Sequence, residues 1–219
     1  MDWKEKNEGL IKWMKGTGAL KSGALERALR AVPRHNFVPK RSEEQAYIDE
    51  PLPIGEGQTI SQPSTVAAMT EALDVRPGQK ILEVGTGSGW QAALLAKMAG
   101  KEGFVWTVER LNGLAETARR NLENAAIKNV KVRVGDGSLG LKEGAPYDRI
   151  IVTAACPDIP RPLVEQLKVG GKMVLPIGDL YTQEMVLVEK VREGSITRKS
   201  LGGFRFVPLV GKHGFRHER

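Results

Sequence analysis

Cysteine is almost absent from this sequence, which contains a single one, Cys156. One thiol cannot form an intramolecular disulfide, so the fold must be held together by its core. The three histidines, His35, His213 and His217, lie far apart and lack the spacing of metal ligands. The sequence therefore predicts neither a disulfide framework nor a metal site.

Long apolar runs are also missing. No stretch approaches the roughly 20 apolar residues that a membrane-spanning helix needs. Residues 1–9 are rich in charge and lack the basic start and apolar run of a signal peptide. The charged residues are Asp2, Lys4, Glu5, Lys6 and Glu8. We therefore expect a cytoplasmic protein without a membrane partner.

Negative charge is in deficit, with 26 Asp and Glu against 33 Lys and Arg, which gives a formal net charge of +7. A basic balance suits nucleic acid, and it equally suits an acidic substrate. The cations are dispersed, however, and the densest local cluster lies within 212–219. No basic run is interleaved with aromatic residues. A solvated basic surface is favoured over a nucleic-acid interface.

One domain is expected from the length and composition. The chain has 219 residues, of which 41% are hydrophobic and 27% charged, and this suits a single α/β domain with its own core. Two short helices are predicted near the N-terminus, the second with Ser22 as its N-cap and Pro33 after its end. Residues 37–64 are rich in proline and glycine and lack periodicity, which predicts a long functional loop.

Strands and helices alternate after this loop, which predicts a parallel sheet with helices on both faces. A hairpin around Glu193-Gly194 and one more strand follow, and by fold analogy this ending is typical of methyltransferases. Helices are expected over 66–73, 91–99, 114–126 and 162–167, and strands over 80–84, 104–108, 130–134, 149–153, 172–176, 185–191, 196–201 and 204–210, with 130–134 and 149–153 buried.

A glycine loop follows the strand 80–84 and leads into a helix, which is the position where doubly wound sheets bind ligands. Its Gly-x-Gly-x-Gly spacing differs from the Gly-x-Gly-x-x-Gly pattern of dinucleotide binding. Glu83 precedes it, and a carboxylate there would repel phosphate and attract an ammonium or sulfonium group. The pattern favours a nucleoside with a cationic methionine tail. The loop consists of Gly85, Thr86, Gly87, Ser88 and Gly89.

Two more acids close the next strands. Glu109 comes 24 positions after Gly85, close to the roughly 20 expected for an acid that binds ribose hydroxyls. Asp136, followed by Gly137, closes the strand after that and could accept from the adenine amino group. Each feature alone is ordinary, as a loop glycine, a strand-end acid or a turn. Together, at three successive strand ends, they predict an adenosyl-binding cleft.

Motifs along almost the whole chain resemble one enzyme family. The specific combination is Gly57-Gln58-Thr59-Ile60-Ser61-Gln62-Pro63 with Phe206-Val207-Pro208-Leu209, and further matching segments cover 32–39, 49–55, 151–157 and 167–172. On these residues the chain resembles the protein-L-isoaspartate (D-aspartate) O-methyltransferase family.

This resemblance implies an α/β fold: a Rossmann-like, doubly wound, mostly parallel sheet with an antiparallel C-terminal hairpin and an N-terminal helical extension. Residues 1–64 would hold the N-terminal helices and the active-site loop, and residues 65–219 the core with the hairpin. All of them would form one methyltransferase domain.

The resemblance also implies an activity. The enzyme would transfer the methyl group of S-adenosyl-L-methionine to the free α-carboxylate of L-isoaspartyl residues, the first step in repairing damaged proteins. S-adenosyl-L-homocysteine would be the product, and no metal would be needed. The expected partners are damaged proteins and peptides rather than nucleic acid, and the expected state is a monomer. Activity on D-aspartyl residues stays open.

Site residues follow from the same resemblance. Ser61 would hydrogen-bond the substrate carboxylate, Thr59 and Ile60 would line the cofactor, and Gln58 belongs to the same loop. Val207 and Leu209 would bind the peptide, largely through their backbone.

Ser61 and Ser64 have a simpler interpretation as well. Both precede the helix 66–73, and from the residues alone an N-cap is favoured for Ser61. With the resemblance, Ser61 becomes the site residue and Ser64 the expected cap. Ser64 stands where some relatives place a histidine, and Trp90 where tyrosine is frequent.

Other features have ordinary interpretations. Cys156 is expected to be a small buried residue rather than a nucleophile. The adjacent acids Asp49 and Glu50 are expected to be structural rather than metal ligands. Two rival functions are an RNA methyltransferase and a non-catalytic adenosyl-binding module. The first predicts a basic stripe or an RNA-binding appendage and the second a lost glycine or Gln-Thr-Ile-Ser loop, and neither feature is seen.

Overall fold

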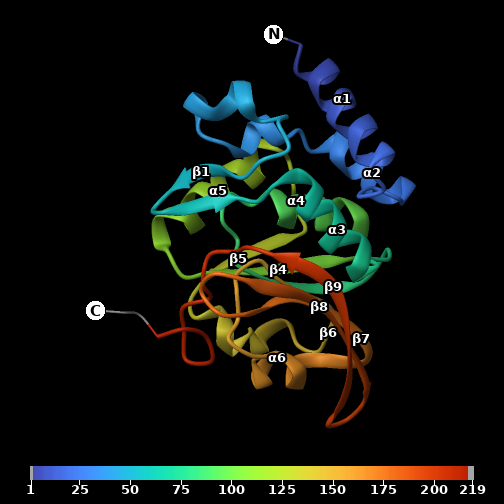
Figure 1. The fold of residues 1–219 in the computed structure, drawn as a ribbon, viewed down its shortest axis with the longest axis vertical. Coiled ribbons are helices and arrows are strands. Elements are labelled where there is room, and N and C mark those ends of the chain that lie inside the picture. Colours follow the sequence, from blue (N-terminus) through green and yellow to red (C-terminus); the bar gives the residue numbers. More distant parts are fainter. Residues whose placement is uncertain (1, 217–219) are drawn as a thin grey trace.

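The computed structural model describes residues 2–216, and a seven-stranded sheet forms their centre (Figure 1). Its strand order is β5-β4-β3-β6-β7-β8-β9. The first five strands in this order run parallel, and β8 and β9 are added antiparallel, as a hairpin. The strands are β3 (Lys80–Val84), β4 (Phe104–Glu109), β5 (Val130–Val134), β6 (Tyr147–Val152), β7 (Leu167–Gly178), β8 (Gln183–Arg192) and β9 (Ser195–Phe204).

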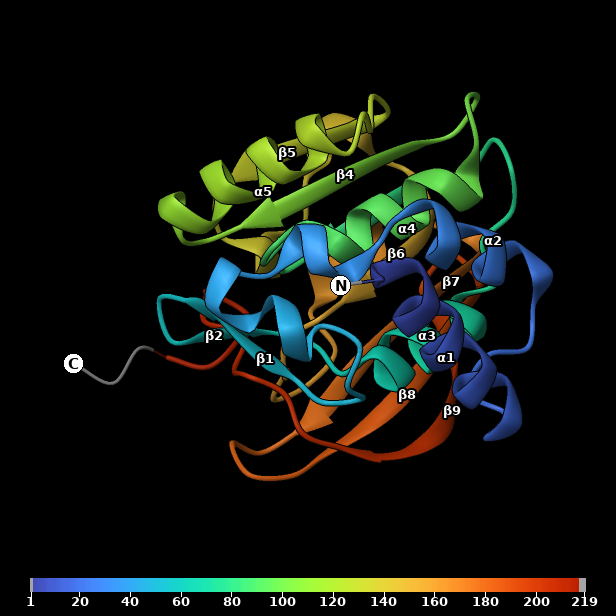
Figure 2. The ribbon, with the colours of Figure 1, turned by 90° about the horizontal axis from the view of Figure 1, so that it is seen from above.

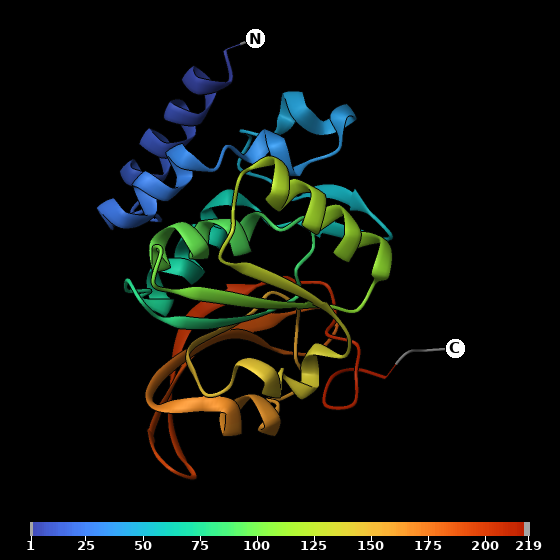
Figure 3. The same cartoon turned by 180° about the vertical axis from the view of Figure 1, so that it is seen from behind.

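Helices cover both faces of this sheet, as the alternation predicts (Figures 1 and 3). On one face lie α3 (Pro63–Leu73), α4 (Trp90–Ala99) and α5 (Asn112–Asn124), and on the other lies α6 (Arg161–Gln166). Successive strand residues point to opposite faces. In β3, Ile81 therefore joins the core under α3–α5, while Leu82 and Val84 join the core that contains Leu163 of α6.

Two helices extend the fold at the N-terminus, α1 (Trp3–Gly16) and α2 (Gly23–Ala31). The predicted cap of α2 is confirmed, because the Ser22 hydroxyl accepts from the amide of Leu25 at 3.3 Å. The helix ends before Pro33, as expected, since proline cannot continue the backbone hydrogen bonding.

The segment 37–64 is more ordered than the sequence predicts. It follows the 3₁₀ turn η1 (Arg34–Phe37) and contains η2 (Lys40–Gln45) and a hairpin of β1 (Leu52–Gly55) and β2 (Gln58–Ile60). The hairpin turn places Glu56 and Gly57 at φ 50° and 70°, the left-handed pair typical of a two-residue hairpin loop. A hairpin with strands this short leaves no periodicity to detect.

Two strand predictions are wrong. The strand β5 lies at the edge of the sheet, so only Val132 in it is buried, and it is not the fully buried strand expected. The last predicted strand, 204–210, does not form, because β9 already ends at Phe204. Beyond it the chain makes isolated bridges instead, such as the parallel pairing of Pro208 with Ala155.

Candidate active site

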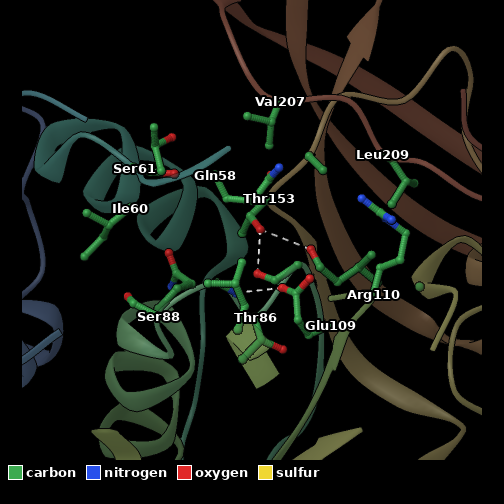
Figure 4. Close-up of a pocket in the computed structure, with 18 of the residues that line it drawn as sticks. Gln58, Ile60, Ser61, Thr86, Ser88, Glu109, Arg110, Thr153, Val207 and Leu209 are labelled. Carbon is green, nitrogen blue, oxygen red and sulfur yellow. Dashed lines mark hydrogen bonds between the residues drawn. The ribbon is translucent and has the colours of Figure 1, made fainter. Parts of the chain in front are cut away.

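A cavity of about 240 Å³ lies at the carboxyl ends of β3, β4 and β6 (Figure 4). The glycine loop forms one part of its wall, the end of β4 another, and the β2 segment and residues 207–210 two more. Side chains of the helices α3, α4 and α5, together with Gly137 and residues 153–154, complete it. Figures 1 and 2 show the β1–β2 hairpin and the C-terminal segment at the same edge of the molecule. Parallel sheets of this kind place their ligands at this edge.

The glycines of the loop have different tasks. Gly85 and Gly87 line the cavity with φ of 95° and 52°, and a Cβ on Gly85 would collide with the Thr153 hydroxyl. Only glycine adopts such a backbone at little cost where space is this tight. Gly89 is not on the wall: it caps α4, and a Cβ there would lie 3.4 Å from the Cβ of Ala118 on α5. Its role is helix packing rather than ligand contact.

Glu109 is on the cavity wall, where the sequence predicts it. Its side chain is buried, and its two oxygens accept from the amide of Gly87 at 2.9 Å and from the amide of Leu111 at 3.0 Å. An ionised carboxylate has about four acceptor positions, so two stay available for hydroxyl donors in the cavity.

Glu83 does not lie where the sequence predicts it. The sequence predicts it near a cationic ligand, but Glu83 does not line the cavity and its side chain is fully buried. The hydroxyl of Thr107, its partner on β4, donates to one carboxyl oxygen, and that hydroxyl also contacts Thr86 Oγ1 at 2.6 Å. Burial raises the pKa of Glu83 to about 8. The group is therefore mostly uncharged at neutral pH and is screened from the cavity by Thr86 and its neighbours.

Asp136 also differs from the prediction, which places it beside the adenine ring. It is not among the residues that line the cavity, and three donors from the chain itself reach its two oxygens. One accepts from the amide and hydroxyl of Ser138 at 2.9 and 2.6 Å, and the other from the amide of Lys212 at 2.8 Å. Burial alone would raise the pKa of Asp136, but these bonds lower it. The neighbouring Gly137 does reach the wall, where a Cβ would lie 2.5 Å from Val84 Cγ1.

The remaining predicted residues meet across the cavity. Thr86 and Ser88 belong to the glycine-loop wall. Gln58, Thr59, Ile60 and Ser61 line a second part, and Val207 and Leu209 a third (Figure 4).

The backbone of Val207 and Leu209 is less available than expected. Ala155 donates to the Val207 carbonyl and accepts from the Leu209 amide, both at 2.8 Å, and the Leu209 carbonyl accepts from Phe215. These groups hold the segment in place, so backbone reading of a peptide would fall to the Val207 amide and the Pro208 carbonyl.

Arg34 is a residue that the sequence reasoning missed. Its guanidinium is buried and donates to three carbonyls: Ala46 at 2.7 Å, Glu50 at 2.9 Å and Ser61 at 3.1 Å. It also lies over the ring of Trp90, 5.5 Å from the centroid. Burial lowers the pKa of Arg34 to about 10. In the sequence, only its position in the segment 32–39, which resembles the family, could have pointed to Arg34. The carbonyls that it contacts lie 12, 16 and 27 residues further along the chain.

Ser64 is not a cap, contrary to the prediction. Helix α3 begins at Pro63, and the Ser64 amide and hydroxyl both donate to Asp49 at 2.7 Å. Asp49 also accepts from the side chain of Gln62 at 2.7 Å. The carboxylate that caps this helix thus comes from 15 residues upstream, which local capping patterns cannot reveal. The structural interpretation of Asp49 is supported.

Other chemistry is limited within the described part of the chain. Cys156 is fully buried, and burial raises the pKa of its thiol to about 12, which suits a packing residue. Among residues 2–216 no three His, Cys, Asp or Glu side chains gather closely enough to hold a metal ion. None of the helices in this range has the length and apolar character needed to cross a bilayer.

The fold and the cavity define a class. A parallel sheet with a glycine loop after β3, an acid at the end of β4 and an antiparallel hairpin at its end is the Rossmann-like fold of S-adenosylmethionine-dependent methyltransferases. The chain belongs to the protein-L-isoaspartate(D-aspartate) O-methyltransferase family, whose model matches residues 5–214. The predicted family and fold are confirmed.

Individual relatives agree. A protein-L-isoaspartate O-methyltransferase of Methanopyrus kandleri is 53% identical over 210 residues, covering 95% of this chain and 93% of its own length. A solved structure with the same name superimposes with a TM-score of 0.87 at 31% identity, covering 95% of this chain and 67% of that chain. A third relative, from Plasmodium falciparum, was solved with S-adenosyl-L-homocysteine and superimposes with a TM-score of 0.82 at 26% identity, covering 93% and 98% of the two chains.

Proposed function

We propose that this protein methylates the free α-carboxylate of L-isoaspartyl residues in damaged proteins and peptides, with S-adenosyl-L-methionine as the methyl donor. The observation that carries this proposal is the meeting of three elements around one cavity. The Gln58–Ser61 segment and the 207–209 segment face a glycine loop at the switch edge of a methyltransferase sheet. The rival RNA methyltransferase is not favoured by the family or by the relatives.

The cavity suits an adenosyl group. Gly85, Gly87 and Gly137 line the cavity with their backbone, and a Cβ on any of them would lie within 3.3 Å of another side chain of the protein. Glu109 retains acceptor positions for ribose hydroxyls. S-adenosyl-L-methionine, when bound, supplies an electrophilic methyl group on a sulfonium. In this proposal the residues that hold it are Gln58, Thr59, Ile60, Gly85, Thr86, Gly87, Ser88, Glu109 and Gly137. Glu83, Gly89 and Asp136 support the walls instead.

No general base is needed for this reaction. Carboxyl groups titrate near pKa ~4, so the accepting carboxylate is already ionised at neutral pH. What the chain must supply is orientation and exclusion of water. The Ser61 hydroxyl suits this task, since within residues 2–216 it makes no hydrogen bond, while its carbonyl is fixed by Arg34. A neutral donor can hold the carboxylate without weakening it as a nucleophile, as a tight ion pair would.

Selectivity would come from geometry. An isoaspartyl residue routes its main chain through the side-chain carboxyl and leaves the α-carboxylate free on a backbone with one extra methylene. A cavity that reads extended backbone accepts many sequences but rejects a normal aspartyl linkage. The segment 207–209 offers such a surface through the Val207 amide and Pro208 carbonyl.

Paired peptides test the proposal directly. Two synthetic peptides that differ only in an isoaspartyl or aspartyl linkage are incubated with the protein and methyl-labelled S-adenosyl-L-methionine. Base-labile label on the isoaspartyl peptide alone is the expected result. Label on neither peptide, with cofactor binding intact, would contradict the proposal, and transfer RNA would then be offered as an acceptor.

Ser61→Ala tests the assigned role of the hydroxyl. Losing one hydrogen bond to a charged group costs about 1.5–3 kcal/mol, so turnover should fall roughly 10- to 100-fold. Affinity for S-adenosyl-L-homocysteine should change little. Ser200→Ala, on the exposed outer strand β9, is the matched control. A large loss of cofactor affinity with unchanged turnover would refute the role.

The proposal also includes where and how the enzyme acts. We place it in the cytoplasm as a monomer, with damaged proteins as its partners. Light scattering behind a sizing column tests the monomer, and a mass near twice 24.0 kDa would contradict it.

A further inference from the structure

The C-terminal segment 205–216, here called the strap, closes one side of the cavity. It follows β9 at the C-terminal end of the described chain (Figure 2) and contributes Val207, Pro208, Leu209 and Val210 to the wall. Figure 4 shows the side chains of Val207 and Leu209. Ala155, three residues beyond the end of β6, anchors the strap through two backbone hydrogen bonds of 2.8 Å. This anchor fixes only the first half of the strap.

A second anchor lies at the turn after β5. Asp136 accepts from the Lys212 amide at 2.8 Å, and the Ser138 hydroxyl accepts from the His213 amide at 3.0 Å. Ser138 in turn donates to Asp136 at 2.6 Å, so the two side chains form one unit. Both bonds to the strap reach backbone amides, and they therefore fix the path of its main chain whatever side chains it carries at 212 and 213.

Gly211 shows how closely the strap lies on this unit. A Cβ there would collide with Asp136 Oδ1 and would lie 2.7 Å from the Ser138 hydroxyl. Its backbone φ is not in the left-handed region, so the tight space, and not the conformation, demands glycine. The strap then folds back on itself, with Phe215 donating to the Leu209 carbonyl at 2.7 Å.

The turn 136–138 also contributes to the cavity wall on the side where the adenosyl group is proposed to bind. Gly137, between Asp136 and Ser138, lines the wall against Val84. One short turn thus presents backbone to the proposed adenosyl site and two side chains to the strap.

We propose that Asp136 and Ser138 are positioning residues that latch the strap and thereby set the peptide-binding side of the cavity. This rests on the proposed function, in which Val207 and Leu209 contact the peptide. It differs from the expectation that Asp136 accepts from adenine, because a latch acts on the peptide and leaves cofactor affinity intact.

Two variants test the latch from opposite sides. Ser138→Ala removes the acceptor of the His213 amide, and Gly211→Ala pushes the strap off the turn. The controls are Ser200→Ala and Gly203→Ala, since both lie on the exposed part of β9 and a Cβ on Gly203 meets no atom within 4 Å. The KM and kcat for an isoaspartyl peptide and the Kd of S-adenosyl-L-homocysteine are measured for all four.

Both latch variants should raise the peptide KM by up to roughly tenfold, the equivalent of one hydrogen bond, while the Kd of S-adenosyl-L-homocysteine stays within about twofold. The controls should match the wild type. An unchanged KM in both latch variants would overturn the proposal. Equal losses of peptide and cofactor affinity would also overturn it, because the turn would then be a general support of the cavity.

Amide hydrogen exchange gives a readout that does not need activity. Exchange at Lys212 and His213 should speed up in Ser138→Ala and stay unchanged in Ser200→Ala. Unchanged exchange would refute the latch even if the wild type methylates isoaspartyl peptides. Conversely, faster exchange in a protein that methylates no isoaspartyl peptide would leave the latch in place and refute the proposed function.

Discussion

Replacing Glu83 with glutamine should change how stability depends on pH. The carboxyl is fully buried, and burial raises its pKa from 4.5 to about 8. An acid with a raised folded-state pKa keeps its proton when the unfolded chain has lost it. Below pH 4.5 both states are protonated and the group has no effect. Between pH 4.5 and about 8 the unfolded state is progressively favoured, so stability falls as pH rises.

The size of this effect follows from the shift. At 1.36 kcal/mol per pKa unit, Glu83 removes about 3 kcal/mol from the free energy of unfolding at pH 7 and about 5 kcal/mol above pH 8. Glutamine mimics the protonated acid and carries no such dependence. Its amide NH2 would take the place of the carboxyl oxygen Oε1, which has no hydrogen-bond partner within the described residues, so a pH-independent cost of about 1–3 kcal/mol is expected as well.

Urea unfolding of the ligand-free protein at several values between pH 5 and pH 9 measures both terms. The difference between Glu83→Gln and wild type should shift in favour of the variant by about 4 kcal/mol from pH 5 to pH 9. Glu102→Gln, an exposed acid, is the matched control and should show no slope. A constant difference across this range would refute the raised pKa and the reasoning from burial.

Three further predictions concern single residues. Arg34→Lys keeps the charge but loses the planar guanidinium that donates to three carbonyls, so the free energy of unfolding in urea should fall by about 2–4 kcal/mol. The variant should also lower kcat more than cofactor affinity. An unchanged kcat would contradict the role of Arg34 in fixing the Ser61 carbonyl. Cys156 should resist maleimide at pH 8 and react fully in urea, and rapid labelling of the native protein would contradict its burial and raised pKa. Gly85→Ala should weaken binding of S-adenosyl-L-homocysteine roughly tenfold or more, measured by calorimetry, because a Cβ meets Thr153 at a positive φ; an unchanged Kd would contradict this.

The parallel core could be predicted because its signals are local. Each inner strand is a short apolar run between turn residues, because both of its faces are buried. In β3, for example, Ile81 packs in one core and Leu82 packs in the other, on the opposite face of the sheet. Position in the sheet is not a local property. In β5, valine alternates with the charged residues Lys131 and Arg133, which indicates one exposed face but does not tell that the strand lies at the edge of the sheet. Residues 205–210 are extended without a strand partner along their length. The β1–β2 hairpin was missed because three or four residues carry too little pattern.

Site residues divide in the same way. Gly85, Gly87 and Glu109 follow from strand ends and spacing, and the cavity contains all three. Sequence position gives the place of a Cα atom but not the direction of its side chain. Glu83 lies within β3 opposite Thr107, and the alternation of the strand turns it to the same face as Ile81, where it is buried and does not line the cavity. Asp136 does lie at a strand end, but its partner is 76 residues away in the strap.

The active-site loop shows what the chain supplies to a reaction that needs no base. The Ser61 carbonyl is held by the cation of Arg34, and the amide of Ser64 and the side chain of Gln62 are held by the anion of Asp49. Opposite charges thus restrain carbonyl and amide groups within four consecutive residues, and both charges come from 13–27 residues upstream. Orientation of reacting groups can lower a barrier by several kcal/mol, but only if the groups are held in advance. A segment that the sequence predicts as a long functional loop is therefore fixed at its main chain, and the Ser61 hydroxyl lines the cavity from a restrained backbone.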